Sequence, residues 1–168
     1  MLAIFAGRGA DAAFRQTILN TLKSKLSLSE ISSDQIFCEG DSCELTAVFE
    51  KNPAKIYAPD AAVVLCRASS LENFSGQRYC ILNSANSDDI ETAKKSGGEV
   101  ISCGLSLRDT VTFSSFTEDR CVISVQRPIT RFDGRTVEPF ELPLSVHDGD
   151  DRYGILCANL LLILGGYI

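Results

Sequence analysis

The stretch LAIFAGRGADAAFRQTILNTL, residues 2–22, contains the three parts that decide the fold. Residues 2–6 form an apolar run typical of a buried strand, and Gly7 and Gly9 follow it in a tight turn. From Asp11 onward, apolar side chains recur at the spacing of a helix, and Asp11 itself stands at the N-cap position. A strand, a glycine-rich turn and a helix in this order have the layout of a phosphate-binding loop.

The composition indicates an ordinary globular protein. The chain has 168 residues, of which 45% are hydrophobic and 23% charged, so residues 1–168 suit a single domain that buries its own core. The net charge is -6 and the pI is near 4.8. Because this charge repels phosphate backbones and anionic lipids, we expect neither nucleic acid nor membrane as a partner.

The N-terminus and the cysteines favour a cytoplasmic protein with reduced thiols. Residues 1–9 lack the basic region, long apolar stretch and small-residue cleavage site of a secretory signal. The number of cysteines is seven, which is odd, and most lie inside apolar runs, so we expect free thiols in the core. Cys38 and Cys43 stand close together but have no second pair downstream, which argues against a zinc site.

The first two thirds of the chain alternate between strand and helix patterns. Apolar runs predict strands at residues 44–50, 60–66, 79–83 and 99–104, and residues 87–97 read as a short helix closed by a glycine. Alternation of this kind predicts a mainly parallel sheet flanked by helices, the P-loop-like α/β class.

The pattern changes after Gly104. Residues 110–116, 120–127 and 136–144 read as strands joined by short turns, which predicts an antiparallel set in the C-terminal half. The chain then closes with an apolar helix at residues 155–164, stopped by Gly165 and Gly166 and capped by Asp150 or Asp151. Ten residues are too few to cross a bilayer, which takes roughly twenty.

This order of elements resembles the central, ATP-binding domain of the Mur ligase family, whose enzymes form amide bonds and which includes folylpolyglutamate synthetases. The resemblance covers nearly all 168 residues and lies mostly in the order of weak motifs. The segments that carry it are IFAGRGADAA (4–13), AVFEKN (47–52), PDAAVVLC (59–66), LNSANSDD (82–89), EVISCG (99–104) and LPLSVHDGDDRYGILCANLLLILGG (142–166).

The phosphate loop departs from the family pattern at the two positions whose side chains serve the phosphates and the metal. In the family loop ITGTNGKTTT the lysine draws the nucleotide phosphates, and the next hydroxyl helps to hold Mg²⁺. Alignment of Gly9 with the last loop glycine puts Ala10 at the lysine and Asp11 at the hydroxyl. An aspartate there accepts the free N–H groups of the helix and repels a polyphosphate. The alternatives are a positive charge lent by Arg8 and a weak anion site on the loop of Gly7 and Gly9.

The implied metal site has also lost residues. The resemblance places Glu50 at an acidic strand end that serves the family's nucleotide and metal site. The family segment TNxxxDH, however, is replaced here by LCRASSLEN, which puts Ser70 and Leu71 at its Asp and His positions. A charged strand end facing water is therefore the favoured interpretation of Glu50, and a retained Mg²⁺ ligand is the alternative.

His147 is the one histidine and the remaining candidate for chemistry. It stands in SVHDGDD (145–151), where the resemblance places an HN pair of the family. A Ser-His-Asp arrangement is the catalytic alternative, but no nucleophile elbow accompanies it. A histidine among acids in a loop before a helix favours a capping or solvated role.

These observations predict a degenerate, stand-alone Mur-ligase central domain that no longer hydrolyses ATP and acts as a binding or regulatory module. We expect neither ATP nor Mg²⁺ as cofactor and assign no catalytic residue. The alternative is an ATP-dependent amide ligase with an unorthodox loop. Because the C-terminal helix is apolar nearly all round, a homodimer is expected to cover it, with burial inside a monomer as the alternative; any protein partner is unknown.

Overall fold

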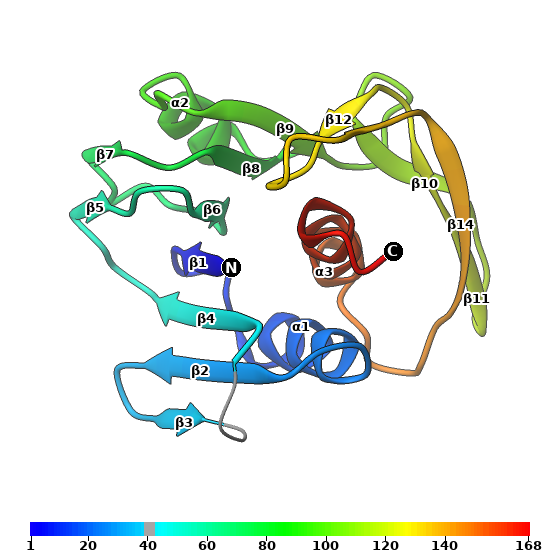
Figure 1. The fold of residues 1–168 in the computed structure, drawn as a ribbon, viewed down its shortest axis with the longest axis horizontal. Helices are drawn as coiled ribbons and strands as arrows, with labels where there is room; N and C mark the ends of the chain where they lie inside the picture. Colours follow the sequence, from blue (N-terminus) through cyan, green and yellow to red (C-terminus); the bar gives the residue numbers. More distant parts are fainter. Residues whose placement is uncertain (39–42) are drawn as a thin grey trace.

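The computed structural model describes residues 1–38 and 43–168. Among these residues ten strands form one sheet, in the order β14-β11-β10-β9-β8-β6-β1-β4-β2-β3. Six neighbouring strands run parallel through its centre, and α1 and α3 lie inside its curve, with α2 outside (Figure 1). The α/β class predicted from the alternation is confirmed. These six strands are β1 (Leu2–Ala6), β2 (Leu28–Ser32), β4 (Leu45–Glu50), β6 (Ala62–Leu65), β8 (Tyr79–Asn83) and β9 (Glu99–Cys103). The next strand, β10 (Val111–Phe116), also pairs parallel with β9, through Val111 and Cys103 alone.

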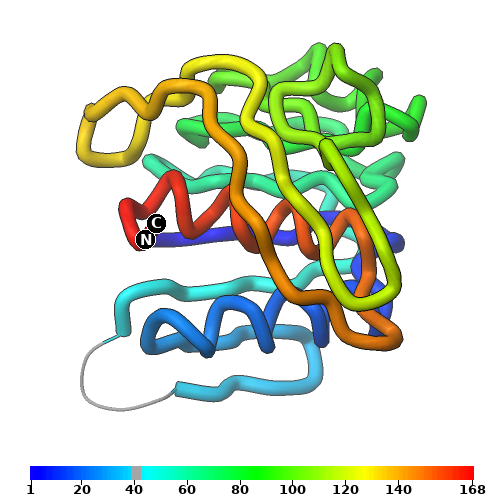
Figure 2. Tube along the Cα trace, turned by 90° about the vertical axis from the view of Figure 1, so that its right-hand side faces the viewer, coloured from blue at the N-terminus to red at the C-terminus, as the bar shows by residue number. Residues whose placement is uncertain are grey.

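The antiparallel part continues this sheet past α3. Strands β10 (Val111–Phe116), β11 (Arg120–Val125) and β14 (Phe140–Ser145) pair antiparallel, as predicted for the C-terminal half. The register of β10 on β11 shifts between Phe113 and Ser115, and such a bulge strengthens the local bend. The three strands cross over α3 and complete the curve of the sheet (Figure 2).

Two of the sequence predictions are wrong in detail, and some short strands were not predicted. Residues 136–144 do not form one strand: β13 (Thr136–Val137) pairs with β12 (Ile129–Thr130) in a separate small sheet, and β14 starts only at Phe140. Helix α2 (Ser87–Ala93) ends before the glycine, because Lys94 caps it in ordinary helical backbone. The edge strand β3 (Ile36–Cys38) and the pair β5 (Lys55–Tyr57) and β7 (Asn73–Ser75) were not predicted, because strands of three residues are too short to show an alternating pattern.

Helix α3 (Arg152–Gly165) fills the centre of the molecule. Every residue from Gly154 to Leu164 is buried, and Gly166 ends the helix in the left-handed conformation, as predicted. Asp151 is its N-cap. Gly154 permits close approach to α1 (Ala12–Lys23), because a Cβ there would lie 3.2 Å from Thr17 Cβ. The apolar surface of α3 is thus covered inside one chain, which removes the reason for expecting a dimer. None of the helices in the described part of the chain has the length and apolarity needed to span a membrane.

Candidate functional site

The loop after β1 lies where the carboxyl ends of β1, β4 and β6 meet, the usual place for ligands in an open α/β sheet. Its backbone is tied to the neighbouring strand ends. The Gly7 N–H donates to the Glu50 carbonyl at 2.9 Å, and the Gly9 N–H donates to the Cys66 carbonyl at 2.7 Å. Two donors that a phosphate loop would offer to an anion are therefore used inside the protein.

Both loop glycines lie close to the backbone of Cys66, the residue after β6. Gly7 has φ +123°, and a Cβ on it would lie 2.2 Å from the Cys66 carbonyl oxygen. A Cβ on Gly9 would lie 3.0 Å from the same oxygen. The glycines thus serve a close backbone approach, which explains them without any bound phosphate.

Ala10 and Asp11 complete the closure of the loop. Ala10 is buried, and its N–H donates to the Gly7 carbonyl at 3.3 Å. The Asp11 carboxylate accepts the Phe14 N–H at 3.0 Å and caps α1. The start of this helix therefore holds an acidic side chain where a phosphate would have to bind.

Arg8 and Glu50 are joined through a third residue. Arg8 Nε donates to Asn52 Oδ1 at 2.9 Å, and the Asn52 N–H donates to Glu50 Oε1 at 3.2 Å. Glu50 is exposed at the end of β4. Leu71, at the position that the resemblance assigns to a histidine, is only 1% exposed and packs in the apolar core outside the sheet.

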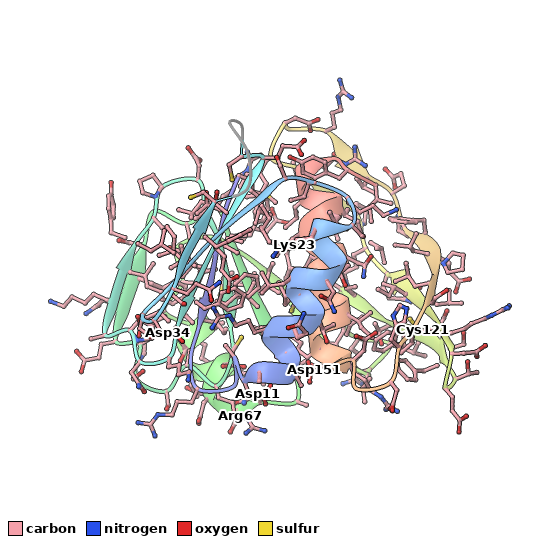
Figure 3. The ribbon with its side chains drawn as sticks, turned by 90° about the horizontal axis from the view of Figure 1, so that it is seen from below. Asp11, Lys23, Asp34, Arg67, Cys121 and Asp151 are labelled. Atoms are coloured by element: carbon pink, nitrogen blue, oxygen red, sulfur yellow. The ribbon has the colours of Figure 1, made fainter. Side chains whose placement is uncertain are left out.

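Beside the loop lies a cavity of about 160 Å³. Helices α1 and α3 both begin at it, so their caps Asp11 and Asp151 come together here with Arg67, as Figure 3 shows at one end of the two helices. Three carboxylates and two guanidinium groups line it. The lining residues are Arg8, Gly9, Asp11, Phe14, Arg67, Asn83, Asn86, Asp89, Asp151 and Tyr153.

Asp89 is the innermost charged residue of this cavity. It is 1% exposed, its Oδ1 accepts the Ala68 N–H at 3.0 Å, and its Oδ2 has no hydrogen-bond partner. Burial raises the pKa of Asp89 to about 6, against the opposing effects of the backbone N–H groups of Ala68 and Arg67 and of the positive charge of Arg67. Sequence reasoning placed Asp89 in the LNSANSDD segment but gave it no role, because nothing local distinguishes it from the exposed Asp88.

Arg67 was also missed. It follows β6 with φ +56°, which is uncommon for a residue with a side chain and clusters at functional sites. Its side chain runs beside the loop, since a Cβ on Gly9 would lie 3.4 Å from Arg67 Cγ. The sequence around it carries no signal for this conformation, because the contact joins segments almost sixty residues apart.

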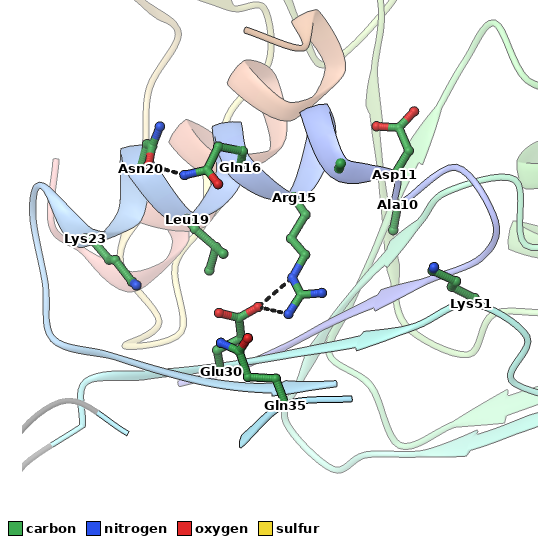
Figure 4. A pocket seen from close by; sticks show the side chains of 11 residues that line it. Ala10, Asp11, Arg15, Gln16, Leu19, Asn20, Lys23, Glu30, Gln35 and Lys51 are labelled. Carbon is green, nitrogen blue, oxygen red and sulfur yellow. Dashed lines mark hydrogen bonds and ion pairs between the residues drawn. The ribbon is translucent and has the colours of Figure 1, made fainter. Parts of the chain in front are cut away.

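A larger hollow of about 470 Å³ lies on the other side of α1, between that helix and β2 (Figure 4). Its central feature is Arg15, whose Nε donates to Glu30 Oε1 at 2.6 Å and whose Nη2 donates to Ser32 Oγ at 3.1 Å. Glu30 is 2% exposed and so depends on this partner. The charge of Arg15 is thereby neutralised, although Lys23 and Lys51 also line the hollow.

His147 lies apart from the loop, in a hollow of about 430 Å³ between α1 and the segment that precedes α3. Its side chain is 84% exposed, with Nδ1 3.6 Å from Asp150 Oδ2, and its backbone N–H donates to the same oxygen at 2.8 Å. The Thr17 hydroxyl is 3.5 Å from Asp150 Oδ1. These contacts order the segment that leads into α3 and fit a solvated loop histidine.

The cysteines are free thiols throughout the described residues. Five of them are buried, as predicted: Cys66, Cys80, Cys103, Cys121 and Cys157. Cys38 and Cys43 are exposed, and the segment between them lies outside the described residues. Within residues 1–38 and 43–168, no three histidine, cysteine or acidic side chains are grouped so that they could hold a metal ion.

Comparison with known proteins shows a similarity of fold. No protein-family profile and no curated protein matches the sequence. Among solved structures, the chain is similar to a UDP-N-acetylmuramoyl-L-alanyl-D-glutamate–2,6-diaminopimelate ligase, with a TM-score of 0.59 and 8% sequence identity. The match covers 98% of this chain and 42% of that ligase. The protein therefore has a Mur ligase-like fold over nearly its whole length.

Proposed function

We propose that this Mur ligase-like chain does not hydrolyse ATP and acts as a binding or regulatory module. The observation that carries the proposal is the closed start of α1. The Asp11 carboxylate accepts the Phe14 N–H at 3.0 Å and places a negative charge at the start of the helix, and Ala10 supplies no positive charge.

The closed loop disfavours a triphosphate in two ways. A phosphate group would lose the Gly7 and Gly9 donors, which already bond to the Glu50 and Cys66 carbonyls. It would also stand beside the carboxylate of Asp11, and like charges a few ångströms apart repel strongly where water is partly excluded. Arg8 does not offset this readily, because its guanidinium is hydrogen bonded to Asn52.

Calorimetric titration with ATP, in the presence and absence of Mg²⁺, tests the proposal. We expect no binding by the natural chain. The double variant Ala10→Lys, Asp11→Thr restores the charge and the hydroxyl, and a gained charge-assisted contact of this kind corresponds to roughly a tenfold or greater rise in affinity.

Asp151→Thr is the control, because it also replaces a capping aspartate beside the same cavity but adds no lysine to the loop. It should leave ATP binding absent. Tight binding of Mg-ATP by the natural chain would contradict the proposal and favour the ATP-dependent amide ligase with an unorthodox loop. If the double variant also fails to bind, the backbone of the loop, and not its side chains alone, has lost the phosphate site.

The assembly state is a separate question. A homodimer was predicted on the assumption that α3 needs an external cover, but its residues 154–164 are buried within one chain. The dimer therefore stays a prediction without a structural reason behind it. Light scattering at micromolar concentration measures the mass directly, and we propose that it gives a monomer.

A further inference from the structure

The cavity between the starts of α1 and α3 contains a buried carboxylate, Asp89, one of whose oxygens has no hydrogen-bond partner. Asp89 Oδ2 is shielded from solvent and accepts no hydrogen bond. Among the described residues, no lysine or arginine forms an ion pair with Asp89. A buried charge left unpaired destabilises a protein, so an unpaired carboxylate that lines a cavity points to a ligand that supplies its partner.

Two further carboxylates face the same space. Asp11 and Asp151 each use Oδ1 to cap a helix, accepting the Phe14 N–H at 3.0 Å and the Gly154 N–H at 2.6 Å. Each retains a second carboxylate oxygen beside the cavity, which both residues line. The acidic side chains therefore surround one small volume from α1, α2 and α3.

The positive groups lie at the rim of the cavity. Arg8 and Arg67 are both exposed, whereas Asp89 is buried. Arg8 is held by Asn52. Arg67 attracts the Asp89 carboxylate from the rim and so opposes the effect of burial on its pKa. Because three carboxylates line the cavity against two exposed guanidinium groups, its buried part fits a cationic group better than an anionic one.

An apolar hollow adjoins the acidic cavity. It has a volume of about 250 Å³ and shares Asn83, Asp151 and Tyr153 with the first cavity. Leu105 and Leu156 provide apolar surface on its wall, and Leu105 is 68% exposed. Exposed leucine beside a polar cavity is the arrangement expected of a ligand pocket that takes a polar head and an apolar body.

We infer that the two hollows bind a small organic cation, with a protonated amine paired to Asp89 and an apolar group against Leu105. The inference rests on the proposed loss of the nucleotide site, because a bound triphosphate would occupy the same end of α1. The inference specifies the class of ligand that the proposed binding module would bind, which is an amine attached to an apolar group.

Three compounds of one shape test the class. Benzylamine, benzyl alcohol and benzyl phosphate are titrated separately into the full chain at neutral pH, with calorimetry as the readout. Benzylamine should bind at least about tenfold more tightly than benzyl alcohol, since a hydrogen bond to a charged partner adds roughly that factor. Benzyl phosphate should bind more weakly than either.

Two variants and a control locate the ligand. Asp89→Asn keeps the shape and removes the charge, so it should abolish the preference for the amine over the alcohol. Asp88→Asn makes the same change one residue earlier on the exposed side of α2 and should preserve that preference. Leu105→Ala should lower the affinities for benzylamine and benzyl alcohol by the same factor, so the ratio of the two affinities should stay unchanged.

The inference is overturned if benzylamine and benzyl alcohol bind equally, if neither binds, or if Asp89→Asn keeps the preference. The first two results need no variant, so a poorly folded variant does not obscure them. Binding of benzyl phosphate that is tighter than binding of benzylamine would also overturn the inference. Failure of the inference is distinguishable from failure of the proposed function, because only the latter is decided by the titration with ATP.

Discussion

Helices α1 and α3 begin in the same way, although only α1 follows a loop with the layout of a phosphate site. Each has an aspartate N-cap in extended backbone, and each cap accepts the N–H three residues further on. A helix start that holds a phosphate leaves its donors free, whereas an ordinary cap fills them. The likeness of Asp11 to Asp151 shows that α1 has an ordinary acidic cap at its start, although the loop before it has the layout of a phosphate site.

The two helix starts differ in how the backbone before them is held. Gly7, before α1, is buried against the Cys66 carbonyl, while Gly149, before α3, is exposed, and a Cβ on it would have no atom within 4 Å. The loop before α1 thus keeps a tightly packed form without the charged residues that would use it. In this loop, close packing of the backbone is therefore present without the side chains that would bind a phosphate.

Substitution of the two glycines should give the largest difference. Gly7→Ala places a Cβ 2.2 Å from a carbonyl oxygen at φ +123°, so we expect a loss of roughly 3 kcal/mol or more in the free energy of unfolding. Gly149→Ala also requires a left-handed residue, at φ +88°, but meets no atom, and should cost about 1 kcal/mol. Urea unfolding measures both, and equal losses would show that the loop does not pack on β6 as described.

Asp89 should give the next largest effect, through pH. Its pKa is about 6 in the folded chain against 3.8 as the ordinary value, so the folded state holds the proton more tightly than the unfolded state. The contribution of Asp89 to the free energy of unfolding is therefore most favourable when its carboxyl group is protonated. This contribution falls as the pH rises from about 4 through 6, and above that range it is lost. The difference between the two pKa values corresponds to a loss of at most about 3 kcal/mol in the free energy of unfolding.

A parallel measurement on two proteins isolates this effect. Between pH 5 and pH 7 the natural chain should lose roughly 1–2 kcal/mol that the Asp89→Asn variant does not lose. Asp34, whose pKa is lowered mainly by the Ser32 hydroxyl, changes stability only at more acid pH and does not overlap. Asp88→Asn serves as the control and should follow the natural chain. If the free energy of unfolding changes with pH in the same way for all three proteins, the pKa of Asp89 is not raised by burial.

The smallest effect is expected at the helix caps and bears most directly on the comparison. Asp11→Ala and Asp151→Ala should each cost about 1 kcal/mol, because each removes one cap of the same kind. Asn at either position should retain most of that stability. Thermal or urea unfolding is sufficient. A rise in stability for Asp11→Ala alone would mean that this carboxylate is strained in place for a function, and the likeness of the two helix starts would then fail.

The sequence predicted the regular parts of the fold closely. β1 and β8 were placed to the residue, and the glycine end of α3 and the cap by Asp11 were also correct. These elements depend on local periodicity and local hydrogen bonds, which adjacent residues determine by themselves. β2 was missed because Glu30 interrupts its apolar pattern, and that side chain is buried only because Arg15 comes from α1 to pair with it.

The candidate site also has features that the local sequence determines and features that depend on distant contacts. By itself the sequence determined that the phosphate loop has Ala10 and Asp11 in place of a lysine and a hydroxyl residue, because those identities are fixed by position along the chain. Only the tertiary structure decided that Asp89 is buried and Asp88 exposed, and that Asp11 and Asp151 share one cavity. The burial of a charge depends on which distant segments pack around it, and parallel strands joined by long crossovers bring such segments together at one edge of the sheet.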